Sequence, residues 1–160
     1  MVSRLSKNSR LRLVEHNVIN IIFQLIKSCN RSKPHMEVLK HGLNIIENLS
    51  MDPETIGSVF WAPEGIEIMV ECTQAYRENE AVFESVVKIL LIHLEQDARR
   101  RRVVKGMIPE VKKLKGVLAV MQRKVEREKR TKSLYSAPGK SVVLLIQTVG
   151  KLQRVVELLQ

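Results

Sequence analysis

Apolar residues recur at alternating steps of three and four along almost the whole chain, and this spacing constrains the fold most strongly. The clearest stripe lies near the C-terminal end and consists of Val142, Leu145, Val149, Leu152, Val156 and Leu159. Such spacing places side chains on one face of a helix, whereas a half-buried strand alternates at every second residue. No Asn-Gly or Asp-Gly pair, the usual hairpin signal, separates alternating segments. The sequence therefore predicts an all-α fold.

Prolines and capping residues divide the pattern into separate helices. After a basic, flexible segment over residues 1–10, a helix is expected over about 11–30. Its predicted apolar stripe is Val14, Val18, Ile21, Ile22, Leu25 and Ile26. The next helix, which starts near Pro34, has a predicted buried face of Val38, Leu39, Leu43, Ile46 and Leu49. Further helices are predicted over 53–61, 63–76, 80–95, 97–105, 109–130 and 141–159, with a loop over 131–140.

The later helices repeat in the order short, longer and longest. The predicted caps Asp52 and Asp97 lie 45 residues apart, and Pro63 and Pro109 lie 46 apart, which fits the period of about 40–47 for three-helix repeats. The segment Gly106-Met107-Ile108-Pro109-Glu110-Val111 resembles the opening of the second helix in an armadillo repeat. We therefore expect an armadillo- or HEAT-like helical solenoid over 11–160. Its three repeats are expected at about 11–51, 52–96 and 97–160.

The net charge of +10 is distributed unevenly. Residues 13–98 carry six Lys/Arg against 13 Asp/Glu, a balance of −7, whereas residues 99–140 carry 15 against three, a balance of +12. Such asymmetry favours a steered contact with an anionic partner. The candidate residues are Arg99, Arg100, Arg101, Arg102, Lys105, Lys112, Lys113, Lys115, Arg123, Lys124 and Arg127.

Two interpretations of this basic tract stay open: a solvated helix face, and a surface for an anionic macromolecule. A reader of single-stranded nucleic acid would need interleaved aromatic residues to stack bases, and Tyr135 is the one aromatic residue in the tract. Non-specific contact with phosphates remains the alternative to a protein partner. A basic helical-repeat domain that binds nucleic acid is therefore the second functional hypothesis.

One segment resembles a known family. Residues 28–35, Ser-Cys-Asn-Arg-Ser-Lys-Pro-His, followed by Val-Leu-Lys-His at 38–41 and Ile-Glu-Asn-Leu-Ser at 46–50, are similar to the C-terminal armadillo-like region of the abnormal spindle (microcephaly-associated) family. The resemblance covers about residues 14–130. It implies a non-enzymatic scaffold of the spindle pole that acts at microtubule ends in mitosis. The implied location is the cytoplasm, the cytoskeleton and the spindle pole, or the nucleus.

The resemblance also indicates partners. Spindle-pole or microtubule-associated proteins are implied, and an acidic tubulin tail would suit the basic tract. Members of the family typically carry calponin-homology domains and calmodulin-binding IQ motifs ahead of this region, and this sequence contains neither. In armadillo arrays an asparagine on the last helix of a repeat can hold a peptide backbone. Asn48 and, one repeat later, His93 are the peptide-groove candidates, although an Asn48 satisfied by water is an equally open interpretation.

Catalytic motifs are missing from the sequence. There is no Gly-rich phosphate loop, no Gly-x-Ser-x-Gly elbow and no His-Glu-x-x-His zinc helix. Cys29 near His35 suggests a thiol and base, but such residues are also common at a junction of packed helices. We therefore expect no enzyme activity, no cofactor or metal, and no small-molecule substrate. No run approaches the roughly 18 apolar residues of a membrane span, so no membrane partner is expected.

Overall fold

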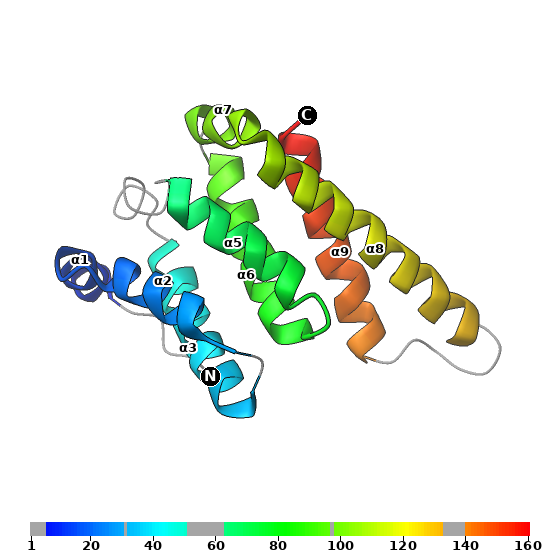
Figure 1. Cartoon of the computed structure of the whole chain (residues 1–160), viewed down its shortest axis with the longest axis horizontal. Coiled ribbons are helices and arrows are strands. Elements are labelled where there is room, and N and C mark those ends of the chain that lie inside the picture. The colour runs from blue at the N-terminus through cyan, green and yellow to red at the C-terminus, as the bar shows by residue number, and fades with distance from the viewer. Residues whose placement is uncertain (1–5, 31, 51–62, 97, 133–139) are drawn as a thin grey trace. The chain divides into compact units, whose positions relative to one another are not determined.

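The computed structural model describes residues 6–30, 32–50, 63–96, 98–132 and 140–160, and these form helices with no strand among them (Figure 1). The all-α prediction is confirmed for these residues. Their helices are α1 (Lys7–Glu15), α2 (Val18–Ser28), α3 (Lys33–Ser50), α5 (Pro63–Ala75), α6 (Glu80–Gln96), α7 (Ala98–Gly106), α8 (Ile108–Lys132) and α9 (Lys140–Leu158). The predicted short helix over 53–61, the predicted caps Asp52 and Asp97, and Tyr135 lie outside the described residues.

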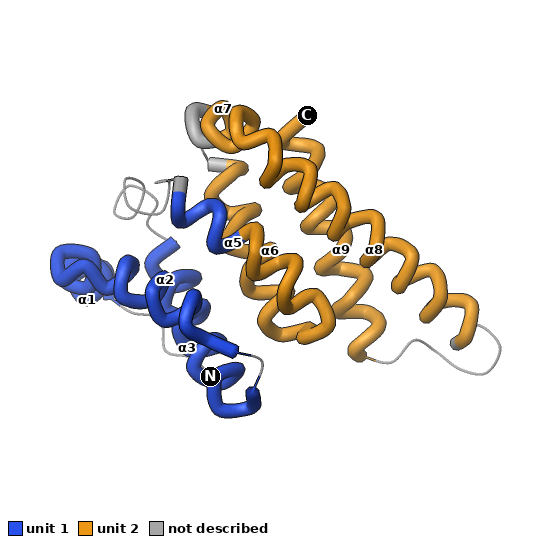
Figure 2. Tube along the Cα trace, viewed as in Figure 1, with its two compact units in different colours: residues 1–69 blue, residues 70–160 orange. Residues whose placement is uncertain are grey.

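The chain divides into two compact units, residues 1–69 and 70–160, with the division inside α5 (Figure 2). In the first unit, α2 packs against α3. Gly42 on α3 makes this approach possible, because a Cβ atom at that position would lie 3.2 Å from Cγ2 of Ile22 on α2. The buried apolar side chains of the two helices are Ile19, Ile22, Phe23, Ile26, Leu39, Leu43, Ile46 and Leu49.

The N-terminal part differs from its prediction. A helix begins at Lys7, inside the segment expected to be flexible, and the hydroxyl of Ser6 caps it by accepting a hydrogen bond from the backbone N–H of Ser9 at 3.2 Å. The single helix predicted over 11–30 is interrupted at Asn17, which adopts the left-handed conformation with φ of 58°. Because Asn tolerates this conformation better than most residues, α1 ends and α2 starts there.

The predicted stripe of this segment is confirmed at Ile22 and Ile26, which are buried, but it is wrong at Ile21 and Leu25. Ile21 is 61% exposed and Leu25 is 39% exposed, whereas Ile19 and Phe23 are buried. Asn20 and Gln24 are exposed on one side of α2, and the buried residues lie at steps of three, one and three on the other. The apolar surface of α2 is wider than its buried face, so Ile21 and Leu25 remain at the exposed edge. Packing against α3 determines which of these apolar side chains are buried. Val38 was wrongly placed on the buried face of α3 as well, since it is 39% exposed.

The second unit is organised around α6 and α9. These helices pack against each other and run in the same direction, and α8 packs antiparallel on α9 (Figure 1). Most apolar residues of α6 are buried, among them Val86, Ile89 and Leu90. All six residues of the predicted α9 stripe are buried as well, which confirms that prediction.

The described connections in the second unit are short. The side-chain oxygen of Asn79 accepts a hydrogen bond from the backbone N–H of Val82 at 3.2 Å, which caps the start of α6. Between α7 and α8 only Met107 is non-helical, so the turn predicted over 106–109 is shorter than expected. The helix predicted to end near Arg130 continues to Lys132, inside the predicted loop 131–140, and residues 133–139 lie outside the described ones.

Candidate functional site

The four arginines at positions 99–102 do not form one solvent-exposed patch. Nη1 of Arg101 donates hydrogen bonds to the backbone carbonyls of Leu94 at 2.9 Å and Glu95 at 3.3 Å, both in the last turn of α6. Carbonyls at a helix C-terminus lack intrahelical partners, and a cation there also complements the helix dipole. Arg101 was predicted to face a partner, but it is half-buried and serves the fold. The side chains of Arg99 and Arg100 lie outside the described part of the chain.

Several predicted cations do point into solvent. Arg102 and Lys105 are exposed on α7, and Lys112 and Lys115 are exposed on the first half of α8. We call these four residues the α7–α8 cations. Lys113 differs from them because its Nζ lies 3.7 Å from Glu110 and 3.9 Å from Glu71 carboxylate oxygens. Its charge is therefore partly balanced within the unit.

A second group of cations surrounds a hollow beside α8. The cavity has a volume of about 370 Å³, and we call it the α8 hollow; it is lined by Glu78, Val120, Arg123, Lys124, Arg127 and Glu128. Three of the predicted anion-binding residues therefore meet at one place. Sequence reasoning missed Val120 and Glu78. The first is an apolar residue, 44% exposed, on an otherwise polar face, and the second lies 46 residues from Lys124.

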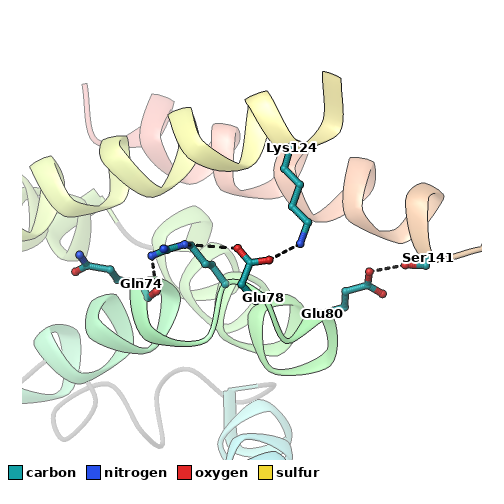
Figure 3. A network of polar contacts seen from close by, with 6 residues as sticks. Gln74, Glu78, Glu80, Lys124 and Ser141 are labelled. Atoms are coloured by element: carbon teal, nitrogen blue, oxygen red, sulfur yellow. Dashed lines mark hydrogen bonds and ion pairs between the residues drawn. The ribbon is translucent and has the colours of Figure 1, made fainter. Parts of the chain in front are cut away.

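One carboxylate already reaches into this hollow. Nζ of Lys124 donates a hydrogen bond to Oε2 of Glu78 at 2.6 Å, and Nε of Arg77 lies 3.7 Å from Oε1 of the same carboxylate (Figure 3). Arg77 in turn donates to the backbone carbonyl of Gln74 at 3.1 Å. The hydrogen bond from Lys124 lowers the pKa of Glu78 below its ordinary value. Glu78 is thus held as a carboxylate between α8 and the link that follows α5.

The two peptide-groove candidates lie in different units. Asn48 is half-buried in the first unit, and its Nδ2 donates a hydrogen bond to the backbone carbonyl of Asn44 at 2.8 Å. His93 is fully buried on α6 in the second unit. A fully buried side chain does not contact a peptide, so His93 does not line a groove. Asn48 keeps its carbonyl oxygen as a further acceptor.

Cys29 and His35, the suggested thiol and base, both contact backbone groups at the joint between α2 and α3. Nδ1 of His35 accepts a hydrogen bond from the backbone N–H of Asn30 at 2.9 Å. Sγ of Cys29 donates a hydrogen bond to the backbone carbonyl oxygen of His35 at 3.7 Å. Burial raises the pKa of the Cys29 thiol, which disfavours the nucleophilic thiolate. The contacts instead fasten the joint between α2 and α3.

Metal-binding clusters and membrane-spanning helices are both absent from the described residues. They contain no group of three or more His, Cys, Asp or Glu side chains arranged to hold a metal ion. Among them, no helix has the length and apolar content needed to cross a bilayer. The described residues therefore define an all-helical protein whose exposed cations are concentrated on α7 and α8.

Comparison with known proteins identifies relatives for part of the chain. A stretch of 79 residues is 37% identical to the abnormal spindle-like microcephaly-associated protein of Homo sapiens, and 35% identical to the homolog of Mus musculus. The homolog of Pongo pygmaeus is 37% identical over the same length. Each match covers 49% of this chain and 2% of the relative, so the chain spans a very small part of those proteins. The similarity supports a relationship to these proteins over about half of the chain. No family model matches, and no solved structure is significantly similar.

Proposed function

We propose that this chain is a non-enzymatic protein-interaction module of a microtubule-associated spindle-pole protein. The observation that carries the proposal is the similarity of half the chain to abnormal spindle-like microcephaly-associated proteins. The partner is an acidic protein segment, such as a tubulin tail, and the module acts in the organisation of the mitotic spindle. Its place in the cell is the cytoskeleton at the spindle pole.

The proposed architecture is an armadillo-like solenoid of about three repeats. Its support lies in the second unit, where α7, α8 and α9 follow one another as a short helix and two long ones. The last helices of two successive repeats would be α6 and α9, and these two helices lie side by side and parallel (Figure 1). Stacking of equivalent helices from neighbouring repeats is how solenoids bury their cores.

Binding would proceed by electrostatic steering towards the α7–α8 cations. Arg102, Lys105, Lys112 and Lys115 are exposed, and their fields extend about one Debye length, roughly 8 Å in physiological salt. Such a field raises the rate of association with an anionic partner and fades as salt is added. The non-enzymatic part of the proposal is supported by the chemistry of Cys29, whose thiol faces a backbone carbonyl and has a raised pKa.

Cosedimentation with microtubules over a series of salt concentrations tests this function. The parent chain is expected to bind at low salt and to dissociate as salt rises. Replacing Arg102 and Lys105 with Gln should weaken binding by about two- to thirtyfold, the range for two exposed charge contacts. The matched control replaces Lys7 and Arg12, two exposed cations of α1, and should bind like the parent. Equal binding by both variants would remove the basic surface from the mechanism.

Gel-shift experiments with duplex and single-stranded oligonucleotides complete the test. Under the proposal, microtubules bind more tightly than oligonucleotides of similar charge density at the same salt concentration. Tighter binding of oligonucleotides would overturn the proposal in favour of nucleic acid as the partner.

A further inference from the structure

The α8 hollow is lined by two arginines whose charges are not paired within the described part of the second unit. Arg123 and Arg127 are exposed, and neither guanidinium has a hydrogen-bond or ion-pair partner among the residues that the structure describes. They are four residues apart and therefore follow each other by one turn, about 6 Å along α8. Like charges at this spacing destabilise a helix slightly. An external anion placed between them would remove that repulsion.

Val120 extends the same line of residues by one turn. It lies three positions before Arg123, lines the hollow, and is 44% exposed. A partner segment along α8 would therefore meet one apolar contact followed by two guanidinium groups. Guanidinium groups bind carboxylates through two parallel hydrogen bonds, which favours a partner rich in Asp or Glu.

Glu78 shows the kind of group that the hollow accepts. Its carboxylate already lies in the hollow, bound to Lys124 at 2.6 Å. Lys124 is consequently occupied, whereas Arg123 and Arg127 are not. Glu78 and Glu128 line the same cavity, and their negative charges would repel the closely spaced phosphates of a nucleic acid. A peptide with a few spaced carboxylates suits this mixture of charges better than a nucleic-acid backbone.

We infer that the α8 hollow binds an acidic protein segment in which an aliphatic side chain is followed by carboxylates. The aliphatic side chain contacts Val120, the carboxylates bind Arg123 and Arg127, and Glu78 competes with the partner for Lys124. This inference rests on the proposed function, because it names the docking place of the same acidic partner. It assigns the binding to the second half of α8 and not to the α7–α8 cations alone.

Fluorescence anisotropy of the full chain with a labelled peptide tests the inference. The probe is a peptide of about ten residues in which single leucines alternate with pairs of glutamates. Replacing Arg123 and Arg127 with Gln should weaken its binding by about two- to thirtyfold. The matched control, in which the exposed α1 cations Lys7 and Arg12 are replaced with Gln, should change it by less than about twofold. Circular dichroism of each variant confirms that the helices are retained.

Two further measurements distinguish specific binding in the α8 hollow from non-specific electrostatic attraction of the peptide. A probe with serine in place of leucine should bind about threefold more weakly, because the contact with Val120 is lost. Glu78→Gln should tighten binding of the leucine probe by about twofold or more, because it removes the competing carboxylate from Lys124. Unchanged binding in the Arg123 and Arg127 variant, or equal loss in both double variants, would overturn the inference.

Failure of this inference and failure of the proposed function give different results. If the Arg102 and Lys105 variant loses microtubules while the Arg123 and Arg127 variant keeps both microtubules and probe, the hollow is refuted and the proposed function stands. If the probe requires Arg123 and Arg127 but the parent chain never cosediments with microtubules, the hollow stands and the microtubule partner is refuted.

Discussion

The same substitution at Arg101 and at Arg102, which are adjacent on α7, should change the free energy of unfolding by different amounts. Arg101 donates to two carbonyls at the end of α6, at 2.9 and 3.3 Å, whereas Arg102 is exposed. Methionine is a suitable replacement at both positions. It keeps an unbranched apolar stem and a similar helix propensity, but removes the charge and every donor. The pair Arg101→Met and Arg102→Met therefore isolates the hydrogen bonds from changes in packing.

The expected loss for Arg101→Met follows from its contacts. A hydrogen bond from a charged donor contributes about 1.5–3 kcal/mol, and a cation at a helix C-terminus about 0.3–1 kcal/mol. Both bonds start from one nitrogen, and water can reach a half-buried site, so these contributions do not simply add. We expect a loss of about 1–2 kcal/mol in the free energy of unfolding. For Arg102→Met the expected change is within about 0.5 kcal/mol.

Urea unfolding followed by circular dichroism measures this difference. With a slope of about 2 kcal/mol per M, typical of a small domain, the midpoint of Arg101→Met should fall by about 0.5–1 M. The midpoint of Arg102→Met should stay near that of the parent, while its binding to microtubules at low salt weakens. Identical midpoints for the two variants would refute the assignment of Arg101 to the end of α6.

Three other predictions concern single side chains. Leu90→Ala should cost about 2–5 kcal/mol in urea unfolding, because Leu90 is 1% exposed in the core around α6; a change below about 0.5 kcal/mol would contradict that placement. Gly116→Ala should stabilise by about 0.5–1 kcal/mol, since a Cβ atom there meets nothing within 4 Å inside α8, and thermal unfolding would detect the rise. Because the pKa of Glu78 is lowered, its ion pair with Lys124 contributes stability above the ordinary carboxyl pKa and loses it as pH falls through the lowered pKa. As pH is lowered, the free energy of unfolding should therefore fall less steeply for Glu78→Gln than for the parent. The same decrease in both proteins would contradict a contribution of this ion pair to stability.

Periodicity predicted the helices well where one face is apolar and the other polar. The α9 stripe from Val142 to Leu159 is such a case, and every member of it is buried. Residues 18–26 carry a narrow polar side at Asn20 and Gln24 and a wide apolar surface, so periodicity alone did not locate the edge of the buried face. Packing against α3 sets that edge. The close approach at Gly42, which is a contact between two helices, could not be derived from either helix alone.

Counting charges along the sequence located the basic tract, but it did not predict which of its residues make contacts within the fold. Arg101 could be assigned to α6 only once the position of the last turn of that helix was known. Lys124 and Glu78 are separated by 46 residues, and no local pattern connects them. By contrast, the exposure of Arg102 and Lys105 agrees with the expectation that part of a cation-rich helix faces water.

Ion pairs within the second unit explain why α8, and not α9, presents unbalanced charge. The carboxylates of α6 are directed towards α9: Glu84 lies 3.4 Å from Lys151, and Glu95 lies 3.7 Å from Arg154. Exposed pairs of this kind contribute about 0–1 kcal/mol each to stability, but they neutralise the cations that they contact. On α8, Lys113 pairs with Glu71 and Glu110, and Lys124 pairs with Glu78. The charge that remains for an anionic partner is therefore concentrated on the outer face of α8, where Arg123 and Arg127 adjoin the α8 hollow.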